Sequence, residues 1–319
     1  MAGRTRKSAS ALPRIVCVVG PTASGKTALG IRLAKLHQGE IINADSRQIY
    51  KGFDIGTGKP EGKRGIHQGH RAFLAGGIPH HLMDFLKPTE AFTAPEWRDA
   101  ALKTVRSTAR RERLPIVVGG TGLYIRSLVD NYTFPKLEPN VHFREAMATK
   151  PLSELVTLLL NLDPDAEQDV DLKNPRRVIR ALEVATFTGK PFSKQKGLGE
   201  PLVEAFQVAI HHSREKLYER NDRTVDKMLK AGWVDEIREA LKKGVSDQAP
   251  AMTSIGYRDL LRYVRGELSL ADATALLKRS VRRYSKRQLT WFMKDKRIRW
   301  AKDEDEAVEL VSEWLGETS

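Results

Sequence analysis

Short apolar runs alternate with longer amphipathic stretches along much of the chain. The apolar runs occupy residues 15–19, 40–42, 81–86, 115–118 and 206–211. Between the first two runs, Leu29, Leu33 and Leu36 recur at helical spacing, and residues 94–113 also carry a helical pattern. Short strands separated by helices predict an α/β fold, in which helices flank a parallel sheet.

The pattern changes between about residues 136 and 200. Helical segments there are broken by prolines, and no stretch has a convincing strand pattern. After about residue 213 the pattern is helical almost throughout, and the last helix, DEDEAVELVSEWLGE, is expected to be solvated. We therefore predict a first part of the α/β core at 1–135, a helical insertion domain at 136–200, and a continuation of the core at 201–319 with its last strand and the C-terminal helices.

An eight-residue loop, GPTASGKT, follows the first apolar run and leads into a helix. Glycines let successive backbone N–H groups converge on an anion, Lys26 adds a positive charge, and Thr27 offers a hydroxyl to Mg²⁺. The predicted phosphate-binding residues are Gly20, Pro21, Thr22, Ala23, Ser24, Gly25, Lys26 and Thr27, with Thr27 as the metal ligand. This motif predicts a P-loop NTPase-like fold but not the reaction, because kinases, ATPases and GTPases share it.

Composition narrows the class of protein. The chain has 319 residues, of which 40% are hydrophobic and 29% charged, as expected for a globular protein with two domains. Cys17 is the single cysteine, so an intrachain disulfide and a zinc cluster are excluded. No run approaches the roughly 18 apolar residues of a membrane helix, and no apolar stretch typical of a secretory signal is present. We expect a cytoplasmic location, no membrane partner and a monomer.

The net charge of +14 indicates a polyanionic partner such as nucleic acid. Residues 278–299 hold ten basic residues and one acid, and five of the basic residues share one helix face: Arg279, Arg282, Arg283, Lys286 and Arg287. A second basic cluster, KNPRRVIR, occupies residues 173–180. Either cluster alone is explained as a solvated helix face, but the two beside a phosphate loop favour RNA or DNA.

The acidic residue that P-loop ATPases use to hold Mg²⁺ is missing from the expected strand end, because the run at 115–118 continues as GGTGLY. Asp84 is an alternative, although a loop or capping role explains it equally well. Asp45 follows the second predicted strand, and strands of an open parallel sheet end at one crevice, so the P-loop, Asp45 and Thr121 can face the same molecule. Taken alone, Asp45 also fits a helix N-cap, and Thr121 a turn hydroxyl.

Seven motifs occur in the same order as in the tRNA dimethylallyltransferases, also called tRNA isopentenyltransferases, of the bacterial type. They are GPTASGKT, NADSRQIY, DIGTGKP, GGTGLY, NPRRVIRALEV, IGY and KRQLTWF. The resemblance covers residues from about 15 to 292 and implies transfer of a dimethylallyl group from dimethylallyl diphosphate to the exocyclic amine of the adenosine 3′ of the anticodon, with release of diphosphate. SIGY stands here where AIGY is usual, and KRQLTWF continues as MKD where arginine is common.

The resemblance also assigns roles to residues. It implies that Asp45 takes a proton from the amine, that Thr121 orients the amine, and that Arg223 joins the P-loop in binding diphosphate, although spacing alone makes Arg223 a surface arginine. It implies Mg²⁺ as cofactor, with the tRNA anticodon stem-loop and dimethylallyl diphosphate as partners. The expected tRNA-binding residues are Asp45, Ser46, Arg47, Gln48, Thr121, His142, Arg176, Arg177 and Arg180, together with Arg282, Arg283, Lys286 and Arg287 of the basic helix face.

Two other classes of function stay open from the residues themselves. A nucleotide or small-molecule kinase would use the same P-loop with ATP, and would transfer or hydrolyse phosphate without RNA. A non-catalytic RNA-binding protein with a relic P-loop would tolerate the loss of Asp45. The resemblance favours the prenyl transferase, and the P-loop leaves ATP binding possible in any of the three.

Overall fold

The computed structural model describes residues 12–135, 137–195 and 197–316, which fall into two compact units. The described residues up to Val129 and from Leu202 onward form the first unit, and Asp130–Pro201 form the second. None of the described helices is both long enough and apolar enough to cross a membrane.

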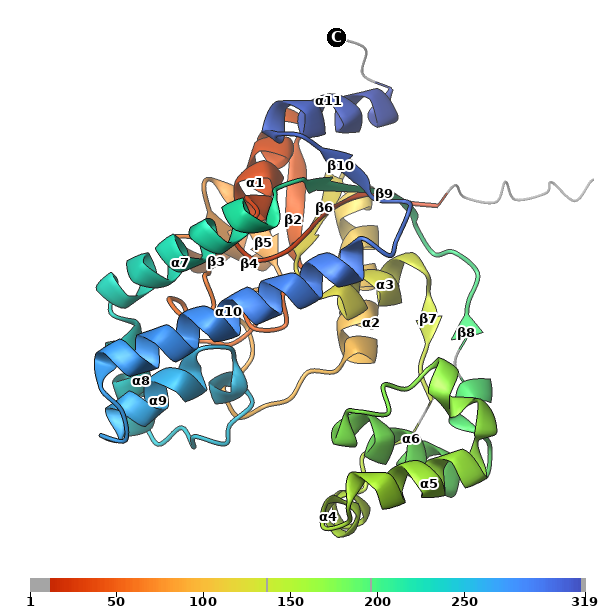
Figure 1. Ribbon diagram of the computed structural model, residues 1–319. Helices are drawn as coiled ribbons and strands as arrows, with labels where there is room; N and C mark the ends of the chain where they lie inside the picture. The colour runs from red at the N-terminus through yellow and green to blue at the C-terminus, as the bar shows by residue number, and fades with distance from the viewer. Residues whose placement is uncertain (1–11, 136, 196, 317–319) are drawn as a thin grey trace, which may run out of the picture. The chain divides into compact units, whose positions relative to one another are not determined.

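An eight-stranded sheet lies at the centre of the first unit, in the order β10-β9-β1-β6-β2-β5-β4-β3 (Figure 1). The strands are β1 (Arg14–Val19), β2 (Gly39–Asn43), β3 (Gly62–His67), β4 (His70–Ala75), β5 (Ile78–His81), β6 (Leu114–Gly119), β9 (Glu204–Ile210) and β10 (Arg299–Ala301). From β10 to β5 all neighbours are parallel, whereas β4 and β3 are antiparallel additions at one edge. The mainly parallel α/β fold expected from the sequence is confirmed.

The prediction of a strand at 81–86 is wrong. The strand β5 ends at His81, and Leu82 and Asp84 then adopt φ values of 56° and 52°, which turn the chain out of the sheet. The preceding hairpin, β3 and β4, was not predicted, because β3 is almost entirely exposed and carries no apolar pattern. The strands expected at 40–42, 115–118 and 206–211 are present with slightly different ends.

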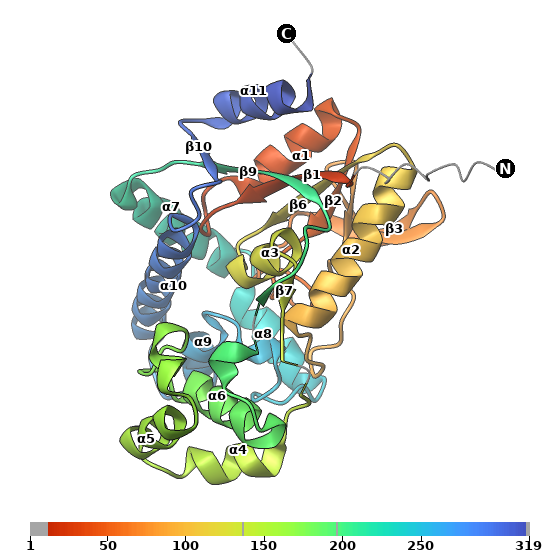
Figure 2. The same cartoon turned by 90° about the vertical axis from the view of Figure 1, so that its right-hand side faces the viewer.

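Helices cover both faces of the sheet (Figure 2). The helices α1 (Lys26–Leu36) and α11 (Glu304–Leu315) pack on one face, and α2 (Ala94–Arg110) and α3 (Gly122–Val129) lie on the other. The expectation that the acidic last helix is solvated is wrong for one of its faces: Ala307 and Val311 are fully buried, and Trp314 stacks on Phe206 of β9 at 5.4 Å.

The remaining helices of the first unit form a group of their own. They are α7 (Arg214–Lys230), α8 (Trp233–Lys242), α9 (Tyr257–Val264) and α10 (Leu270–Phe292), with a 3₁₀ turn at Ala251–Thr253. Trp233, Tyr257 and Phe53 are fully buried at the centre of this group. The segment after β2, which contains Phe53, therefore packs against α8 and α9. Side chains of this helical group line one wall of the site described below.

The second unit is a small helical domain with its own core. Its helices are α4 (Val141–Ala148), α5 (Leu152–Leu162) and α6 (Pro175–Thr188), with 3₁₀ turns at Pro164–Gln168 and Phe192–Lys194. Leu155 and Leu159 of α5 pack against Val178 and Leu182 of α6. Two short strands, β7 (Tyr132–Thr133) and β8 (Gly197–Leu198), pair where the chain enters and leaves the unit, so the sequence-based expectation of no strand in this stretch missed β8.

Candidate active site

The P-loop lies between β1 and α1, as its sequence predicts. Gly20 and Gly25 have φ values of 136° and 97°, which L side chains rarely adopt, so the loop needs glycine at both places. No side chain caps the N-terminus of α1, and the first N–H groups of a helix bind anions. Lys26 Nζ donates to the carbonyl oxygen of Pro21 at 2.6 Å. Burial lowers the pKa of Lys26 to about 8, against the opposing effect of the nearby Asp45 carboxylate.

Asp45 and Thr121 follow the ends of β2 and β6 and are brought together. Thr121 N–H donates to the carbonyl oxygen of Ala44 at 3.1 Å, and Ser46 N–H donates to Thr121 Oγ1 at 3.0 Å. A Cβ at Gly119 would lie 2.2 Å from the Ala44 carbonyl group, so only glycine permits this close approach. Thr121 therefore holds a turn as well as facing the P-loop.

The N-cap interpretation of Asp45 is wrong, because no helix begins there in the described chain. Asp45 Oδ1 instead accepts the backbone N–H of Arg47 at 2.8 Å, which closes a local turn. The turn presents the residues that follow Asp45 to the same crevice. Arg47 Nη1 donates to the carbonyl oxygen of Pro250 at 3.1 Å, and Gln48 Nε2 donates to the carbonyl oxygen of Gly58 at 2.9 Å.

Gln288 of α10 joins the P-loop to the turn after β6, and sequence reasoning missed it. Its Oε1 accepts the N–H of Thr22 at 2.8 Å, and its Nε2 donates to the carbonyl oxygen of Gly120 at 2.8 Å. A Cβ at Gly120 would lie 2.3 Å from that nitrogen. The signals in the sequence were an uncharged polar residue within a basic helix and its place in the motif KRQLTWF.

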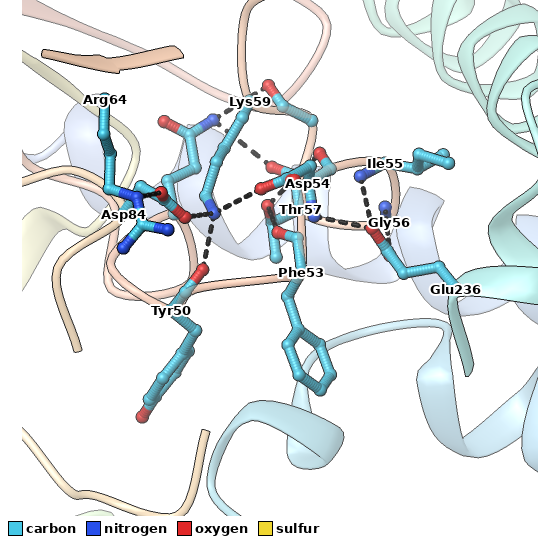
Figure 3. A network of polar contacts seen from close by, with 12 residues as sticks. Tyr50, Phe53, Asp54, Ile55, Gly56, Thr57, Lys59, Arg64, Asp84 and Glu236 are labelled. Atoms are coloured by element: carbon cyan, nitrogen blue, oxygen red, sulfur yellow. Dashed lines mark hydrogen bonds and ion pairs between the residues drawn. The ribbon is translucent and has the colours of Figure 1, made fainter. Parts of the chain in front are cut away.

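A second missed network holds the loop after Phe53 (Figure 3). The carboxylate of Glu236 accepts the backbone N–H groups of Asp54, Ile55 and Gly56 at 2.6, 2.7 and 3.0 Å, and also the hydroxyl of Tyr257 at 2.7 Å. Charge-assisted hydrogen bonds of this kind are about twice as strong as neutral ones. Glu236 thus fixes a loop that lines the site.

Lys59 anchors the other end of the same loop. Its buried ammonium donates to the carbonyl oxygen of Tyr50 and to the carboxylates of Asp54 and Asp84, the last two at 2.6 Å (Figure 3). Asp84 also pairs with Arg64 at 3.0 Å. These contacts make Asp84 a structural loop residue, the second of its two sequence-based interpretations, and it does not line the cavity at the P-loop.

These loops and helices enclose a cavity of about 440 Å³ in the first unit. One part of its wall is polar, with Lys26, Thr27, Asp45 and Thr121. Another part is largely apolar and comes from the helical group: Val225, Met228, Trp233, Ile255, Val281 and Tyr284. A phosphate-binding loop, a facing carboxylate and an apolar wall therefore meet in one space of small-molecule size.

The structure places Arg220, not Arg223, at the P-loop. Arg220 Nε donates to the carbonyl oxygen of Ala23 at 2.6 Å. Arg223 is exposed, pairs with Glu219 at 3.2 Å and does not line the cavity. Thr224 and Met228, which lie four and eight residues after Arg220, line the cavity, so this side of α7 faces the site and Arg223 lies outside it. His212 Nε2 lies 3.1 Å from the carbonyl oxygen of Ser24 and also supports this loop.

The basic residues of α10 do not all have the same surroundings. Arg279, Arg283, Lys286 and Arg287 are exposed, as the predicted basic face requires. Arg282 instead forms a bidentate ion pair with Asp222 of α7. Its charge is therefore partly neutralised within the protein.

In the second unit, too, some of the expected tRNA-binding residues are exposed and one is paired within the protein. His142 of α4 and Arg176 of α6 are exposed, and Arg177 is exposed with Asp171 at 3.8 Å. Arg180 pairs with the fully buried Glu183, which Arg144 also contacts at 2.7 Å. Burial alone would raise the pKa of Glu183, but hydrogen bonds from the two arginines lower it. Arg180 thus serves the core of this unit.

A parallel sheet with a P-loop at its edge, a carboxylate facing that loop and an apolar wall beyond define an enzyme of the P-loop class. Residues 48–295 match the family model described as IPP transferase, which covers more than half of the chain. The chain belongs to the IPP transferase family, as its ordered motifs predict.

Individual relatives agree with this assignment. The tRNA dimethylallyltransferase of Carboxydothermus hydrogenoformans is 38% identical over 309 residues, which cover 94% of this chain and 95% of the relative. The solved tRNA isopentenylpyrophosphate transferase of Bacillus halodurans has a TM-score of 0.67 and 32% identity, with 95% and 96% of the two chains covered. A eukaryotic dimethylallyltransferase solved acting on tRNA has a TM-score of 0.70 and 27% identity, with 88% and 69% covered.

Proposed function

We propose that this enzyme transfers a dimethylallyl group from dimethylallyl diphosphate to the exocyclic amine of the adenosine 3′ of the anticodon in tRNA, and releases diphosphate. The observation that carries the proposal is the cavity in which the P-loop and Asp45 face an apolar wall. The apolar wall beside the phosphate site suits the five-carbon chain of a prenyl diphosphate. The family membership and the names of the relatives support the same reaction.

The donor's diphosphate fits the polar part of the cavity. Backbone N–H groups of the loop, Lys26 and the nearby Arg220 supply positive charge there. Thr27 lines the cavity, and its hydroxyl would hold Mg²⁺, because this ion prefers oxygen ligands. When bound, Mg²⁺ offsets negative charge on the departing diphosphate. The five-carbon chain then lies against side chains such as Met228 and Val281.

Asp45 serves as the base. The lone pair of an adenine amine is delocalised into the ring, so the amine is a weak nucleophile, but it becomes strongly acidic once the new carbon–nitrogen bond forms. A carboxylate at the cavity wall is then sufficient to accept the proton. Thr121 lies next to it through their shared turns and orients the amine.

The target adenosine must leave its stack to enter the cavity, which costs a few kcal/mol. Contacts with the phosphates of the anticodon stem-loop offset that cost. The exposed basic side chains described above supply these contacts: Arg283, Lys286 and Arg287 of α10, and His142, Arg176 and Arg177 of the second unit. We expect a monomer to be sufficient for the reaction and the activity to be cytoplasmic.

The test is a product analysis. The protein is incubated with tRNA, dimethylallyl diphosphate and Mg²⁺, and the nucleosides of the tRNA are examined by mass spectrometry while released diphosphate is measured. One five-carbon unit gained per diphosphate released is the expected result. Stoichiometric formation of ADP from ATP, with no gain of mass on the RNA, would instead favour a kinase.

A further inference from the structure

Trp291 is the one tryptophan of the chain that is exposed. All five tryptophans lie in the described residues; Trp97 and Trp233 are fully buried and Trp300 and Trp314 are half-buried, whereas Trp291 is 39% exposed. It belongs to the last turn of α10. A large aromatic side chain at the surface next to an active site is a candidate for ligand contact.

Trp291 lies against the turn that carries Thr121. A Cβ at Gly122 would be only 2.1 Å from the Trp291 Nε1 atom, so the indole edge packs on this glycine where α10 meets α3 (Figure 1). One helical turn earlier, Gln288 bonds to Gly120 and to the P-loop. Trp291 does not line the cavity itself. The indole is therefore held just outside the cavity, beside a proposed catalytic turn.

A stripe of aromatic and basic side chains connects Trp291 with the cavity. Tyr284, Arg287 and Trp291 follow one another at spacings of three and four residues, so they lie on one side of α10. Tyr284 lines the cavity, and the Arg287 guanidinium lies 5.7 Å from the centre of the Tyr284 ring. Lys294, three residues beyond Trp291, is exposed. Alternating rings and cations are typical of surfaces that hold single-stranded nucleic acid.

We propose that Trp291 is a stacking platform for the unpaired base next to the reactive adenosine. The inference rests on the proposed function and adds a positioning residue outside the cavity. Bases in RNA loops are splayed out and stacked on aromatic side chains when proteins read them. With the adenosine in the cavity, a phosphate of the same strand lies near Arg287, and the neighbouring base covers the indole. This contact keeps the loop open after the adenosine has left its stack.

The test measures affinity for an anticodon stem-loop RNA with Trp291→Ala, Trp291→Phe and Met293→Ala. Met293 is the control, because it is an exposed apolar residue at the same helix end but on the opposite side. Since stacking on one aromatic side chain changes affinity by about 5- to 150-fold, Trp291→Ala should weaken RNA binding within that range. Trp291→Phe should retain most of the affinity, and Met293→Ala all of it. The KM for dimethylallyl diphosphate should not change.

Two RNAs separate stacking from a structural role: in one the nucleotide before the target adenosine is abasic, and in the other the nucleotide after it. The wild type should bind at least one of these two RNAs more weakly than intact RNA, and Trp291→Ala should lose no further affinity for that RNA. Intact RNA should also quench tryptophan fluorescence less in Trp291→Phe than in the wild type, because the four other tryptophans remain. Equal losses with intact and abasic RNA would assign Trp291 to the packing of Gly122 and overturn the proposal. Wild-type product analysis, run in parallel, shows separately whether the proposed function holds.

Discussion

The Asp45 carboxylate serves both the local turn and the cavity. Its Oδ1 accepts the Arg47 N–H, and the residue lies close enough to raise the pKa of Lys26 against the effect of burial. An asparagine retains an acceptor for the turn but cannot take a proton. We therefore expect Asp45→Asn to slow prenyl transfer in a single turnover by roughly 10²- to 10⁴-fold, while the Kd for tRNA changes little.

Asp99→Asn is the control for this substitution, because Asp99 is an exposed aspartate of α2 that contacts only Arg98 among the ion pairs of the described chain. It should turn over like the wild type. A normal single-turnover rate for Asp45→Asn would mean that the carboxylate only closes the turn.

Arg220 and Arg223 offer a matched comparison on one helix. Arg220 contacts the P-loop, whereas Arg223 is exposed and pairs with Glu219. Because hydrogen bonds to charged groups contribute about 1.5–3 kcal/mol, Arg220→Ala should raise the KM for dimethylallyl diphosphate by roughly tenfold or more. Arg223→Ala should leave it unchanged. If steady-state kinetics showed a larger increase of this KM for Arg223→Ala than for Arg220→Ala, Arg223 would be the diphosphate ligand, as the family resemblance suggests.

At the scale of the element, α10 combines three tasks on three faces. Gln288 holds two loops of the site, Arg282 pairs with Asp222, and the outward side chains Arg283 and Lys286 meet solvent. Only the outward cations are expected to replace counterions on RNA. The double variant Arg283→Ala/Lys286→Ala should therefore lower the slope of log K against log salt by about two units, with no change in the free energy of unfolding.

Arg282→Ala tests whether the paired arginine of α10 contributes less to RNA binding than the exposed ones. It should change the salt slope less than either outward substitution, because Asp222 already neutralises the guanidinium. Its stability cost should stay below about 1 kcal/mol, since the pair is partly exposed. Binding isotherms at several salt concentrations and urea unfolding provide both readouts. A slope unchanged in the double variant would show that this face of α10 is only solvated.

The elements that could be predicted from the sequence are those whose local pattern decides their structure. The strand at IVCVV and the phosphate-binding loop at GPTASGKT are predicted correctly, because the apolar run of β1 and the spacing of the glycines are visible in consecutive residues. The run HLMDFL is misread, since its apolar residues line a turn with left-handed backbone at Leu82 and Asp84. The strand β3 lacks an apolar pattern because it lies exposed at the sheet edge.

The supports of the site could not be predicted for a different reason. Gln288 and Glu236 bond mostly to backbone atoms of segments that are far away in the sequence, such as Thr22 and Asp54. Backbone atoms carry no residue-type signal, so nothing in the local sequence points to these pairs. Arg220 and Arg223 were confused because the phase of a helix relative to a loop depends on packing that the sequence pattern does not state.

At the scale of the whole molecule, the chain enters and leaves the second unit at one place. Tyr132 and Thr133 of β7 pair with Leu198 and Gly197 of β8, and Gly199 N–H donates to the carbonyl oxygen of Asn131 at 3.1 Å. The hydrophobic core of this unit is formed by its own helices. Units with adjacent ends and separate cores are the ones that tolerate excision.

We therefore expect that residues 132–198 can be replaced by a short glycine-serine linker without unfolding the first unit. The shortened protein should still unfold cooperatively and bind dimethylallyl diphosphate, because the cavity at the P-loop is lined only by the first unit. Its affinity for tRNA should fall by roughly tenfold or more at moderate salt, since several phosphate contacts are lost. Circular dichroism melting, donor binding and tRNA binding measure the three outcomes.

A full-length variant, His142→Ala/Arg176→Ala/Arg177→Ala, identifies the cause of that loss. These side chains are exposed, so the fold of the second unit should be retained, whereas Arg180 is left in place because it neutralises the buried Glu183. The triple variant should lose most of the tRNA affinity that the excision removes and should keep a normal KM for the donor. Full tRNA affinity in the triple variant would show that the second unit contributes to binding through other residues. Loss of donor binding in the shortened protein would show that the first unit depends on the second for its fold.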